Sequence, residues 1–406
     1  MPGKSDRDYF YYRDLFIGRR LPLAFVDLDR FDANVDYVAD TQKHSGKTIR
    51  VASKSIRCPG LIRRVFDKGG PAFRGILAFT MEEGALLADQ GFDDIIVAYP
   101  TVQRSDMDLM ADIAARGTRI ALVVDSAAQL KCLAQAGRQS GVILDACLEI
   151  DMSYRPVGRS IHLGVRRSPL REPDQAVRLA RRAADLEGVR ITAVMGYEAQ
   201  IASVNDSVPG QRLKNPILRR MKQRSMAELM DRRQAVIQAL EQAGCTIDIV
   251  NGGGSGSLKA TAMDSAVTEV TAGSAFFAPG LFRHFHEVTF QPSAFFALQV
   301  VRRPAPHMIT CLGGGYVASG EVGPNKLPWP VMPPGLTYIG MEGAGEVQTP
   351  LNLPAGIPGP DIGDPVFFQH AKAGELCERF NHLLLVKDGQ IVDRVDTYRG
   401  MGHAFL

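Results

Sequence analysis

Lys54 is the side chain of this sequence best placed to act as a nucleophile. It follows the strand-like run 48–53 and precedes Cys58 and Pro59, a pair typical of the start of a helix. An amine at the end of a strand, partly withdrawn from water, loses its proton near neutral pH and forms a Schiff base with a carbonyl group. Taken alone, a lysine in a polar turn is more often a solvated surface residue.

Two glycine-containing turns provide a second signal. The first follows the apolar run 246–250, and the second follows the run 266–270. Their residues are Asn251, Gly252, Gly253, Gly254, Ser255, Gly273 and Ser274. Where side chains are missing, backbone N–H groups can approach a phosphate at the start of a helix. The alternative for the first turn is a flexible loop without a ligand.

The elements that must position these groups alternate in type. Eight β-branched or apolar runs are separated by amphipathic stretches, which predicts eight parallel strands that are each followed by a helix. The predicted strands are 49–53, 75–79, 94–98, 119–123, 141–149, 190–195, 246–250 and 266–270. The predicted helices are 59–69, 82–91, 104–116, 126–137, 173–187, 222–244, 256–263 and one after the last strand. This count predicts an α/β fold, the (β/α)8 TIM-type barrel, in which ligands bind at the carboxyl ends of the strands.

The barrel does not account for the whole chain of 406 residues. A strand at 23–28 and a helix at 31–44 precede the first barrel strand, and the last part of the chain contains strands separated by Gly and Pro. We therefore expect an N-terminal segment, residues 1–28, that pairs with a β-rich C-terminal domain, residues 283–406. The barrel lies between them, at residues 29–282.

Composition bears on the partners and the location of the chain. The net charge is +3 and basic residues are interspersed with acidic ones, so no nucleic-acid partner is expected. Six cysteines without CxxC spacing suit reduced thiols in the cytoplasm better than a disulfide framework. No apolar run of roughly 18 residues and no signal-peptide core occurs, so we expect a soluble, cytoplasmic protein without a membrane partner.

A lysine and a phosphate site at the same mouth of a barrel together indicate pyridoxal 5′-phosphate (PLP). The aldehyde of PLP would form an imine with Lys54, and its phosphate would lie in the turns after the last two strands. The substrate expected of such a site is a free amino acid. The lysine that was ambiguous by itself therefore gains a function from the glycine turns.

Several motifs carry a resemblance to a known family. They are the runs 23–29, 50–59, 78–87, 95–100, 148–151, 164–165, 196–198, 251–255 and 269–274. Over residues 20–280 the chain resembles the fold-type III PLP enzymes of the D-threonine aldolase and D-serine dehydratase group, which are related to alanine racemase. The resemblance implies that Lys54 forms the imine and that the Tyr197 phenol lies beside it. The alternative for Tyr197 is an aromatic plug at the barrel mouth.

The chain departs from this family near the pyridine ring of the cofactor. Where relatives have an arginine before the Gly-Val at 164–165, this chain has His162. His162 either faces the ring and exchanges a hydrogen bond with its nitrogen, or points away as a polar loop residue. A histidine of the family is also replaced by Gln200, which cannot act as a base. The candidate catalytic residues are thus Lys54, Tyr197 and His162.

A second departure concerns a divalent metal ion. The resemblance implies a metal held by a His-x-Cys or His-x-Asp pair near the carboxyl end of the chain. Here the candidate ligands are His370, Glu375 and Cys377, which offer an imidazole, a carboxylate and a thiolate for Zn²⁺ or Mn²⁺ at a different spacing. The alternative is a surface turn in which Lys372 pairs with Glu375.

These observations lead to one expected reaction. We expect a PLP-dependent lyase that cleaves the Cα–Cβ bond of a β-hydroxy D-amino acid, as D-threonine aldolase does, with a metal at His370 polarising the hydroxyl. The alternatives are β-elimination of the D-serine dehydratase type, amino-acid racemisation and, outside catalysis, a PLP carrier. The resemblance also implies a homodimer in which the β-rich domain of each subunit closes the barrel of the other.

Overall fold

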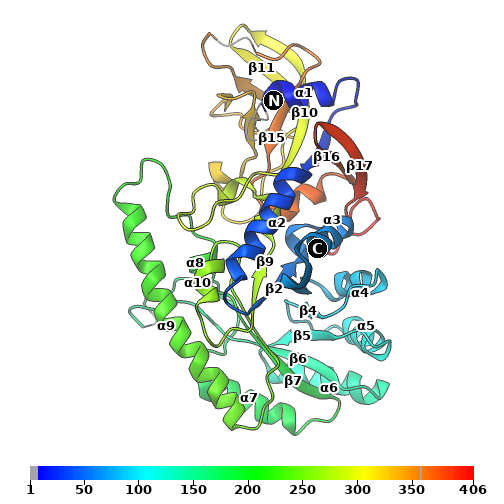
Figure 1. Cartoon of the computed structure of the whole chain (residues 1–406), viewed down its shortest axis with the longest axis vertical. Coiled ribbons are helices and arrows are strands. Elements are labelled where there is room, and N and C mark those ends of the chain that lie inside the picture. Colours follow the sequence, from blue (N-terminus) through cyan, green and yellow to red (C-terminus); the bar gives the residue numbers. More distant parts are fainter. Residues whose placement is uncertain (1–7, 159, 357–358) are drawn as a thin grey trace.

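Eight parallel strands form a closed barrel in chain order, as the alternation of apolar runs predicts (Figure 1). The computed structural model describes residues 8–158, 160–356 and 359–406. The barrel strands are β2 (Thr48–Ala52), β3 (Phe73–Ala78), β4 (Ile95–Val97), β5 (Ile120–Val124), β6 (Leu144–Glu149), β7 (Val189–Gly196), β8 (Ile249–Gly252) and β9 (Glu269–Ala272). The last strand pairs with the first, Thr48 lying opposite Glu269, and this closes the sheet. The predicted barrel is confirmed.

Two of the helices outside the barrel, α4 (Met81–Asp89) and α6 (Ala127–Ser140), begin at polar residues whose side chains accept hydrogen bonds from free backbone N–H groups. Thr80 accepts a hydrogen bond from the Glu83 backbone N–H, and Ser126 forms a capping box with Gln129. The helices are α3 (Pro59–Gly69), α4 (Met81–Asp89), α5 (Arg104–Ala115), α6 (Ala127–Ser140), α7 (Pro173–Ala184), α8 (Ala199–Ala202), α9 (Lys214–Gln242), α10 (Leu258–Ala262) and α11 (Ser274–Phe277). Within the described ranges, no helix is both long and apolar enough to cross a membrane.

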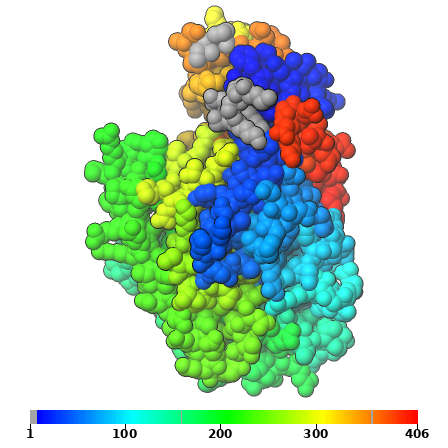
Figure 2. Space-filling model, in the orientation of Figure 1, coloured from blue at the N-terminus to red at the C-terminus, as the bar shows by residue number. Residues whose placement is uncertain are grey.

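The helices next to β8 and β9 differ from the expected lengths. Helix α9 begins at Lys214 rather than at residue 222, and the surface around its first turns stands clear of the rest of the molecule (Figure 2). Helices α10 and α11 have only 5 and 4 residues. Helix α2 (Leu28–Gln42), which precedes the barrel, packs against both, and its Phe31 ring lies 6.0 Å from that of Phe276. A helix from before β2 therefore completes the outer layer.

A buried ion pair lies inside the barrel, where most of the interior is apolar. Arg50 on β2 is fully buried, and its Nε donates to Glu269 Oε1 on β9 at 2.5 Å. The Nη2 of Arg50 also donates to Asp94 Oδ1 at 3.0 Å, and Asn251 Nδ2 on β8 donates to Glu269 Oε1 at 2.8 Å. The apolar interior is formed by Ala52, Leu77, Ile96, Ala98, Ala121, Val123, Cys147, Ala193, Met195 and Ile249. The polar side chains thus join β2, β8 and β9.

The second domain is a nine-stranded sheet that includes a strand from near the N-terminus. Strand β1 (Leu23–Asp27) is antiparallel to β10 and parallel to β16. The other strands are β10 (Ala294–Ala305), β11 (Met308–Leu312), β12 (Trp329–Met332), β13 (Thr337–Tyr338), β14 (Gln348–Asn352), β15 (Pro365–Gln369), β16 (His382–Lys387) and β17 (Gln390–Asp396). Helix α1 (Tyr9–Leu15) packs on this sheet, and Tyr12 Oη donates to Asp27 Oδ2 at 2.6 Å. The predicted β-rich domain with an N-terminal strand is confirmed.

This domain contacts the barrel at the turn that carries Lys54. A Cβ atom added to Gly374 would lie 1.9 Å from the Lys54 carbonyl oxygen, so the two backbones touch. Arg57 Nε donates to the same oxygen at 3.0 Å, and the guanidinium of Arg57 pairs with Glu378. The position of Lys54 is therefore fixed from both domains.

A buried carboxyl group attaches the end of the chain to the barrel. Glu83 in α4 accepts hydrogen bonds from the Phe79 backbone N–H at 2.6 Å and from Tyr398 Oη at 2.7 Å. Burial raises the pKa of Glu83 to about 7, although both hydrogen bonds oppose the shift. The carboxyl group is thus held closer to its neutral form than it would be in the unfolded chain.

Replacing Glu269 with alanine removes the main partner of a buried guanidinium. Because the Arg50 charge then keeps only Asp94 as an acidic partner, we expect the free energy of unfolding to fall by about 3 kcal/mol, measured by urea titration. Arg104→Ala, which breaks an exposed pair with Asp108, is the control and should cost less than about 0.5 kcal/mol. Equal losses for the two variants would contradict the importance of the buried pair.

The Glu83 carboxyl should make stability depend on pH. Its folded pKa of about 7 lies above the unfolded value, so its contribution is fully present at acid pH and is lost as the pH rises toward 7. The Glu83→Gln variant should therefore show a flatter decline in the free energy of unfolding between the two pKa values than the wild type. Parallel pH profiles of the two proteins would show that Glu83 does not titrate as described.

Candidate active site

A cavity of about 1000 Å³ lies at the carboxyl ends of the barrel strands, where the β-rich domain meets the barrel. Its barrel side is lined by Lys54, Tyr99, Arg167, Tyr197, Ser203, Asn251, Gly253, Gly254, Ser255, Thr271, Gly273 and Ser274. The β-rich domain contributes Ser319, Glu321, Lys372, Gly374 and Glu375. Small-molecule sites in proteins occupy about 300–1,000 Å³, so the cavity can hold a cofactor together with a small substrate.

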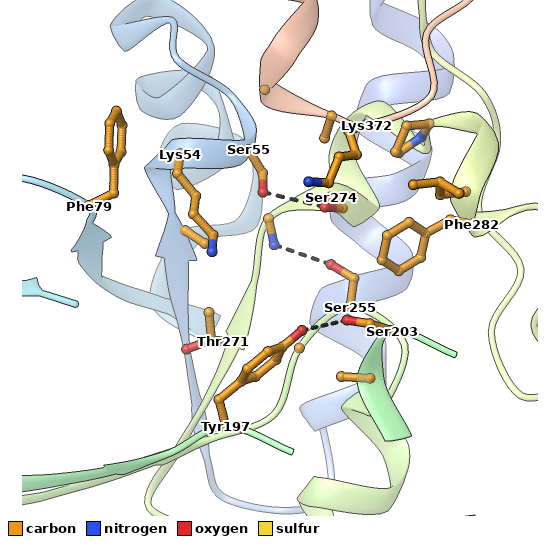
Figure 3. A pocket seen from close by; sticks show the side chains of 18 of the residues that line it. Lys54, Ser55, Phe79, Tyr197, Ser203, Ser255, Thr271, Ser274, Phe282 and Lys372 are labelled. Carbon is orange, nitrogen blue, oxygen red and sulfur yellow. Dashed lines mark hydrogen bonds between the residues drawn. The ribbon is translucent and has the colours of Figure 1, made fainter. Parts of the chain in front are cut away.

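Lys54 projects into this cavity from the short helix η1 (Ser53–Ser55), directly after β2 (Figure 3). Its Nζ donates a hydrogen bond to Tyr99 Oη at 2.7 Å. Burial alone would raise the pKa of Tyr99, but the Lys54 ammonium and its hydrogen bond outweigh burial and lower it. The pair therefore brings an amine and an acidified phenol into direct contact, which suits proton transfer between them.

The two turns expected to bind a phosphate lie next to each other. Ser255 Oγ accepts hydrogen bonds from the Gly273 and Ala275 backbone N–H groups, at 3.3 and 3.0 Å. A Cβ atom added to Gly254 would lie 3.1 Å from the ring of Tyr197, which is tighter than an ordinary contact. Glycine at this position thus lets the turn pack against the aromatic ring.

Hydroxyl groups surround the space between Lys54 and these turns (Figure 3). Ser274 Oγ lies 3.4 Å from Ser55 Oγ, beside Lys54, and Tyr197 Oη lies 2.5 Å from Ser203 Oγ. Hydroxyl and backbone N–H groups are the usual partners of a phosphate. The predicted residues Lys54, Tyr197, Gly253, Gly254, Ser255, Gly273 and Ser274 all line this one cavity.

A buried network behind the first turn holds its backbone in place. Glu198 Oε2 accepts hydrogen bonds from the Gly253 N–H at 3.0 Å and from Arg233 Nη2 at 3.3 Å. Glu198 Oε1 accepts a further one from Thr261 Oγ1 at 2.5 Å. Because Arg233 is also buried and paired with Asp264, the carboxylate of Glu198 has a compensated charge. These groups are buried behind the turn, so they act by holding its backbone in position.

Of the predicted cofactor residues, Gly252 lies outside the cavity, and Asn251 lines it but has its side chain hydrogen-bonded to other barrel residues. Gly252 belongs to strand β8 and is not among the described residues that line the cavity; a Cβ there would face Arg233 Nη2 at 3.1 Å. Asn251 lines the bottom of the cavity, but its side-chain amide donates to Glu269 and to Thr271 Oγ1 at 2.9 Å. The predicted strand 246–250 ends too early, and this is why Gly252 was assigned to the turn.

Of the two alternatives for His162, its position agrees with the polar loop residue rather than with a group that faces the cavity. Its Nε2 lies 3.1 Å from the Val165 carbonyl oxygen, and the cavity lining given above does not include it. Arg167 reaches the cavity instead, with its guanidinium 5.4 Å from the centre of the Tyr197 ring and 3.6 Å from Glu149 Oε1. Burial raises the pKa of Glu149 to about 7, against the attraction of Arg167. The loop therefore presents a cation, but from a position that the sequence motif did not indicate.

The three predicted metal ligands do not converge. His370 is buried beside Phe277, and burial lowers the pKa of its imidazole to about 3. Cys377 Sγ donates to the Ile56 carbonyl oxygen at 3.1 Å, while Glu375 accepts from the Ser319 backbone N–H. Among the described residues, no group of three His, Cys, Asp or Glu side chains could hold a metal ion. His370, Glu375 and Cys377 therefore do not form a three-ligand site among the described residues.

Several residues that line the cavity were not predicted from the sequence. Tyr99 directly follows the predicted strand 94–98, so its position at the end of a barrel strand was a usable signal. Arg167 and Ser203 lie in loops whose course follows no periodic pattern. Lys372 was considered only as a surface partner of Glu375, since its direction depends on how the two domains meet.

Comparison with known proteins agrees with this geometry. The chain is similar to a D-threonine aldolase from Arthrobacter sp., with 25% identity over 375 residues, which are 92% of this chain and 90% of the relative. Its fold is similar to the crystal structure of D-threonine aldolase from Filomicrobium marinum, with a TM-score of 0.80, 22% identity and coverage of 94% of this chain and 95% of that one.

A dehydratase has the same fold. The structure of D-threo-3-hydroxyaspartate dehydratase from Delftia sp. HT23 matches with a TM-score of 0.73 and 18% identity, covering 96% of this chain and 99% of that one. The family model described as alanine racemase, N-terminal domain, matches residues 26–279, which include every strand of the barrel. Since this match covers more than half of the chain, the protein belongs to the family of the alanine racemase N-terminal domain.

Proposed function

We propose that the protein is a PLP-dependent lyase that cleaves the Cα–Cβ bond of a β-hydroxy D-amino acid. One observation carries the proposal: the Lys54 amine and the turns after β8 and β9 line a single cavity of about 1000 Å³. The similarity to D-threonine aldolases along nearly the whole chain supports the choice of reaction. The family and the site chemistry together support the cofactor.

The residues of the cavity fit PLP group by group. Lys54 is the amine that would bind the aldehyde carbon, because it is half-buried and its Nζ faces the cavity. Ser255, Ser274 and the backbone of the two glycine turns would hold the phosphate. A Cβ atom at Gly273 would come within 2.8–2.9 Å of the segment that carries Lys54, so glycine lets the second turn lie close to this lysine. Tyr197 offers an aromatic ring beside these turns. When bound, PLP supplies an electron sink for the negative charge left on the substrate Cα.

The Lys54 and Tyr99 pair moves the protons that this chemistry needs. The lowered pKa of Tyr99 favours its phenolate, and in that form Tyr99 Oη can accept a proton from Lys54 Nζ and leave the amine nucleophilic. Lys54 Nζ then stands at the cavity side from which the substrate Cα can receive a proton after cleavage. Arg167, placed between the rings of Tyr99 and Tyr197, keeps a positive charge next to this pair.

The products formed from D-threonine and D-serine test the reaction. We expect PLP-loaded protein to convert D-threonine into equal amounts of glycine and acetaldehyde, measured by proton NMR. Formation of 2-oxobutanoate and ammonia from D-threonine, or pyruvate and ammonia from D-serine, would instead assign β-elimination, a reaction that the similar fold of a dehydratase makes a specific alternative. Epimerisation without cleavage would assign a racemase, and unchanged amino acids would contradict a lyase.

Replacing Lys54 with alanine should abolish covalent attachment of the cofactor. We expect loss of the visible absorbance of lysine-bound PLP and a fall in kcat of at least about 10³-fold, because both the attachment point and a proton donor are removed. Lys68→Ala, which changes an exposed lysine on α3 paired with Asp36, is the control and should retain both properties. Full turnover by Lys54→Ala would rule out the catalytic assignment of this lysine.

A further inference from the structure

A second amine faces the cavity from the β-rich domain. Lys372 lies just after β15, and Figure 3 shows its side chain extending into the cavity that also receives Lys54. The two lysines therefore approach one enclosed space from different domains. Lys54 is accounted for by the cofactor, whereas the proposed reaction leaves Lys372 without an assigned part.

The contacts of Lys372 leave hydrogen-bond donors free for a ligand. Its Nζ donates to Ser319 Oγ at 2.7 Å and lies 3.8 Å from Glu375 Oε1, beyond hydrogen-bond distance. The carboxylate of Glu375 is engaged by Ser319, whose backbone N–H donates to it at 3.1 and 3.2 Å and whose hydroxyl group also bonds to it. An ammonium has three donors, and one of them is used here.

The position of Lys372 relative to Lys54 is fixed by the backbone. Gly374, two residues further on, packs directly against the Lys54 carbonyl oxygen. Arg57 donates to the same oxygen and pairs with Glu378, so it ties both sides of this contact together. The backbone that carries Lys372 is therefore anchored to the turn that carries Lys54, and Ser319 holds the ammonium by a hydrogen bond.

Cleavage of a Cα–Cβ bond needs a base that takes the proton of the β-hydroxyl, and a positive group at that oxygen helps by lowering the pKa of the hydroxyl. The candidate metal ligands do not form a three-ligand cluster, and Arg57 and Arg167 have the carboxylates of Glu378 and Glu149 as partners. Lys214 and Lys326 also line the cavity, but among the described ion pairs it is Lys372 that has a carboxylate beside it, Glu375 at 3.8 Å. Lys372 has one hydrogen bond, a cavity-facing ammonium and a carboxylate beside it. It thus combines a donor for an oxygen anion with a nearby proton acceptor.

We propose that Lys372 is a catalytic residue whose ammonium binds the β-oxygen of the substrate, while Glu375 accepts the proton of the β-hydroxyl. In this step the O–H bond breaks and its electron pair forms the C=O bond of the aldehyde product. The Cα–Cβ electron pair remains on Cα, which then takes a proton from Lys54. This inference rests on the proposed lyase function and assigns its hydroxyl-binding group.

The test separates handling of the hydroxyl from handling of Cα. Glycine has no β-oxygen, so exchange of its Cα hydrogen for deuterium in D₂O requires the cofactor and Lys54 but not Lys372. For PLP-loaded Lys372→Met we expect kcat/KM for D-threonine cleavage to fall about 10²–10³-fold, as for loss of one oxyanion donor. Glycine exchange and cofactor absorbance should stay within about twofold of the wild type, as expected for an intact cofactor site.

Matched variants give the comparison. Lys372→Arg keeps the charge and should lose less cleavage activity than Lys372→Met, and Glu375→Gln should lose cleavage while keeping glycine exchange. Lys387→Met, which alters an exposed lysine on β16 outside the cavity, should behave as the wild type. If Lys372→Met loses glycine exchange together with cleavage, or loses neither, the assignment is overturned.

Removal of metal ions tests whether an ammonium or a metal binds the β-oxygen. Dialysis of the wild-type protein against a chelator should leave cleavage unchanged if an ammonium binds the β-oxygen. Loss of cleavage that Mn²⁺ or Zn²⁺ restores would assign the β-oxygen to a metal and overturn the proposal for Lys372. Wild-type protein that exchanges glycine but does not cleave D-threonine would instead fail the proposed lyase function itself, and with it the inference.

Discussion

The ion pair between Arg50 and Glu269 is the interaction on which the site depends. It lies inside the barrel across the seam where β2 meets β9, and Asn251 extends it to β8. The same three strands end in the Lys54 turn and in the two turns with small residues. A buried charge without its partner destabilises the fold by several kcal/mol, so separation of these strands or a shift of their register is strongly unfavourable. The interactions that close the barrel therefore also align the turns that form the site.

The β-rich domain adds the second constraint. Its contact with the barrel at Gly374 and Lys54 allows no side chain at position 374, and Arg57 joins the Lys54 carbonyl oxygen to the side chain of Glu378. The cavity thus has one wall from each domain, with an amine on each. In a site of this kind the barrel supplies the cofactor-binding groups, whereas the second domain is free to vary the groups that meet the substrate side chain.

The sequence predicted those features that follow from the regular part of the fold. In a parallel barrel all strands end at one mouth, so Lys54, Ser255 and Ser274 could be placed together from strand spacing alone. His162 and Gly252 were misplaced because the direction of a loop residue and the last residue of a strand depend on tertiary packing. Arg167 and Lys372 could not be foreseen, since the first lies in an irregular loop and the second reaches the cavity only through the contact between domains.

We expect Lys54, and none of the other cavity lysines, Lys214, Lys326 and Lys372, to hold the cofactor. Reduction of the PLP-loaded protein with borohydride fixes the cofactor on its lysine, and peptide mass spectrometry then identifies the modified residue. The account predicts a single pyridoxyl group on Lys54. A modified Lys372, or a protein that carries no pyridoxyl group after reduction, would contradict it.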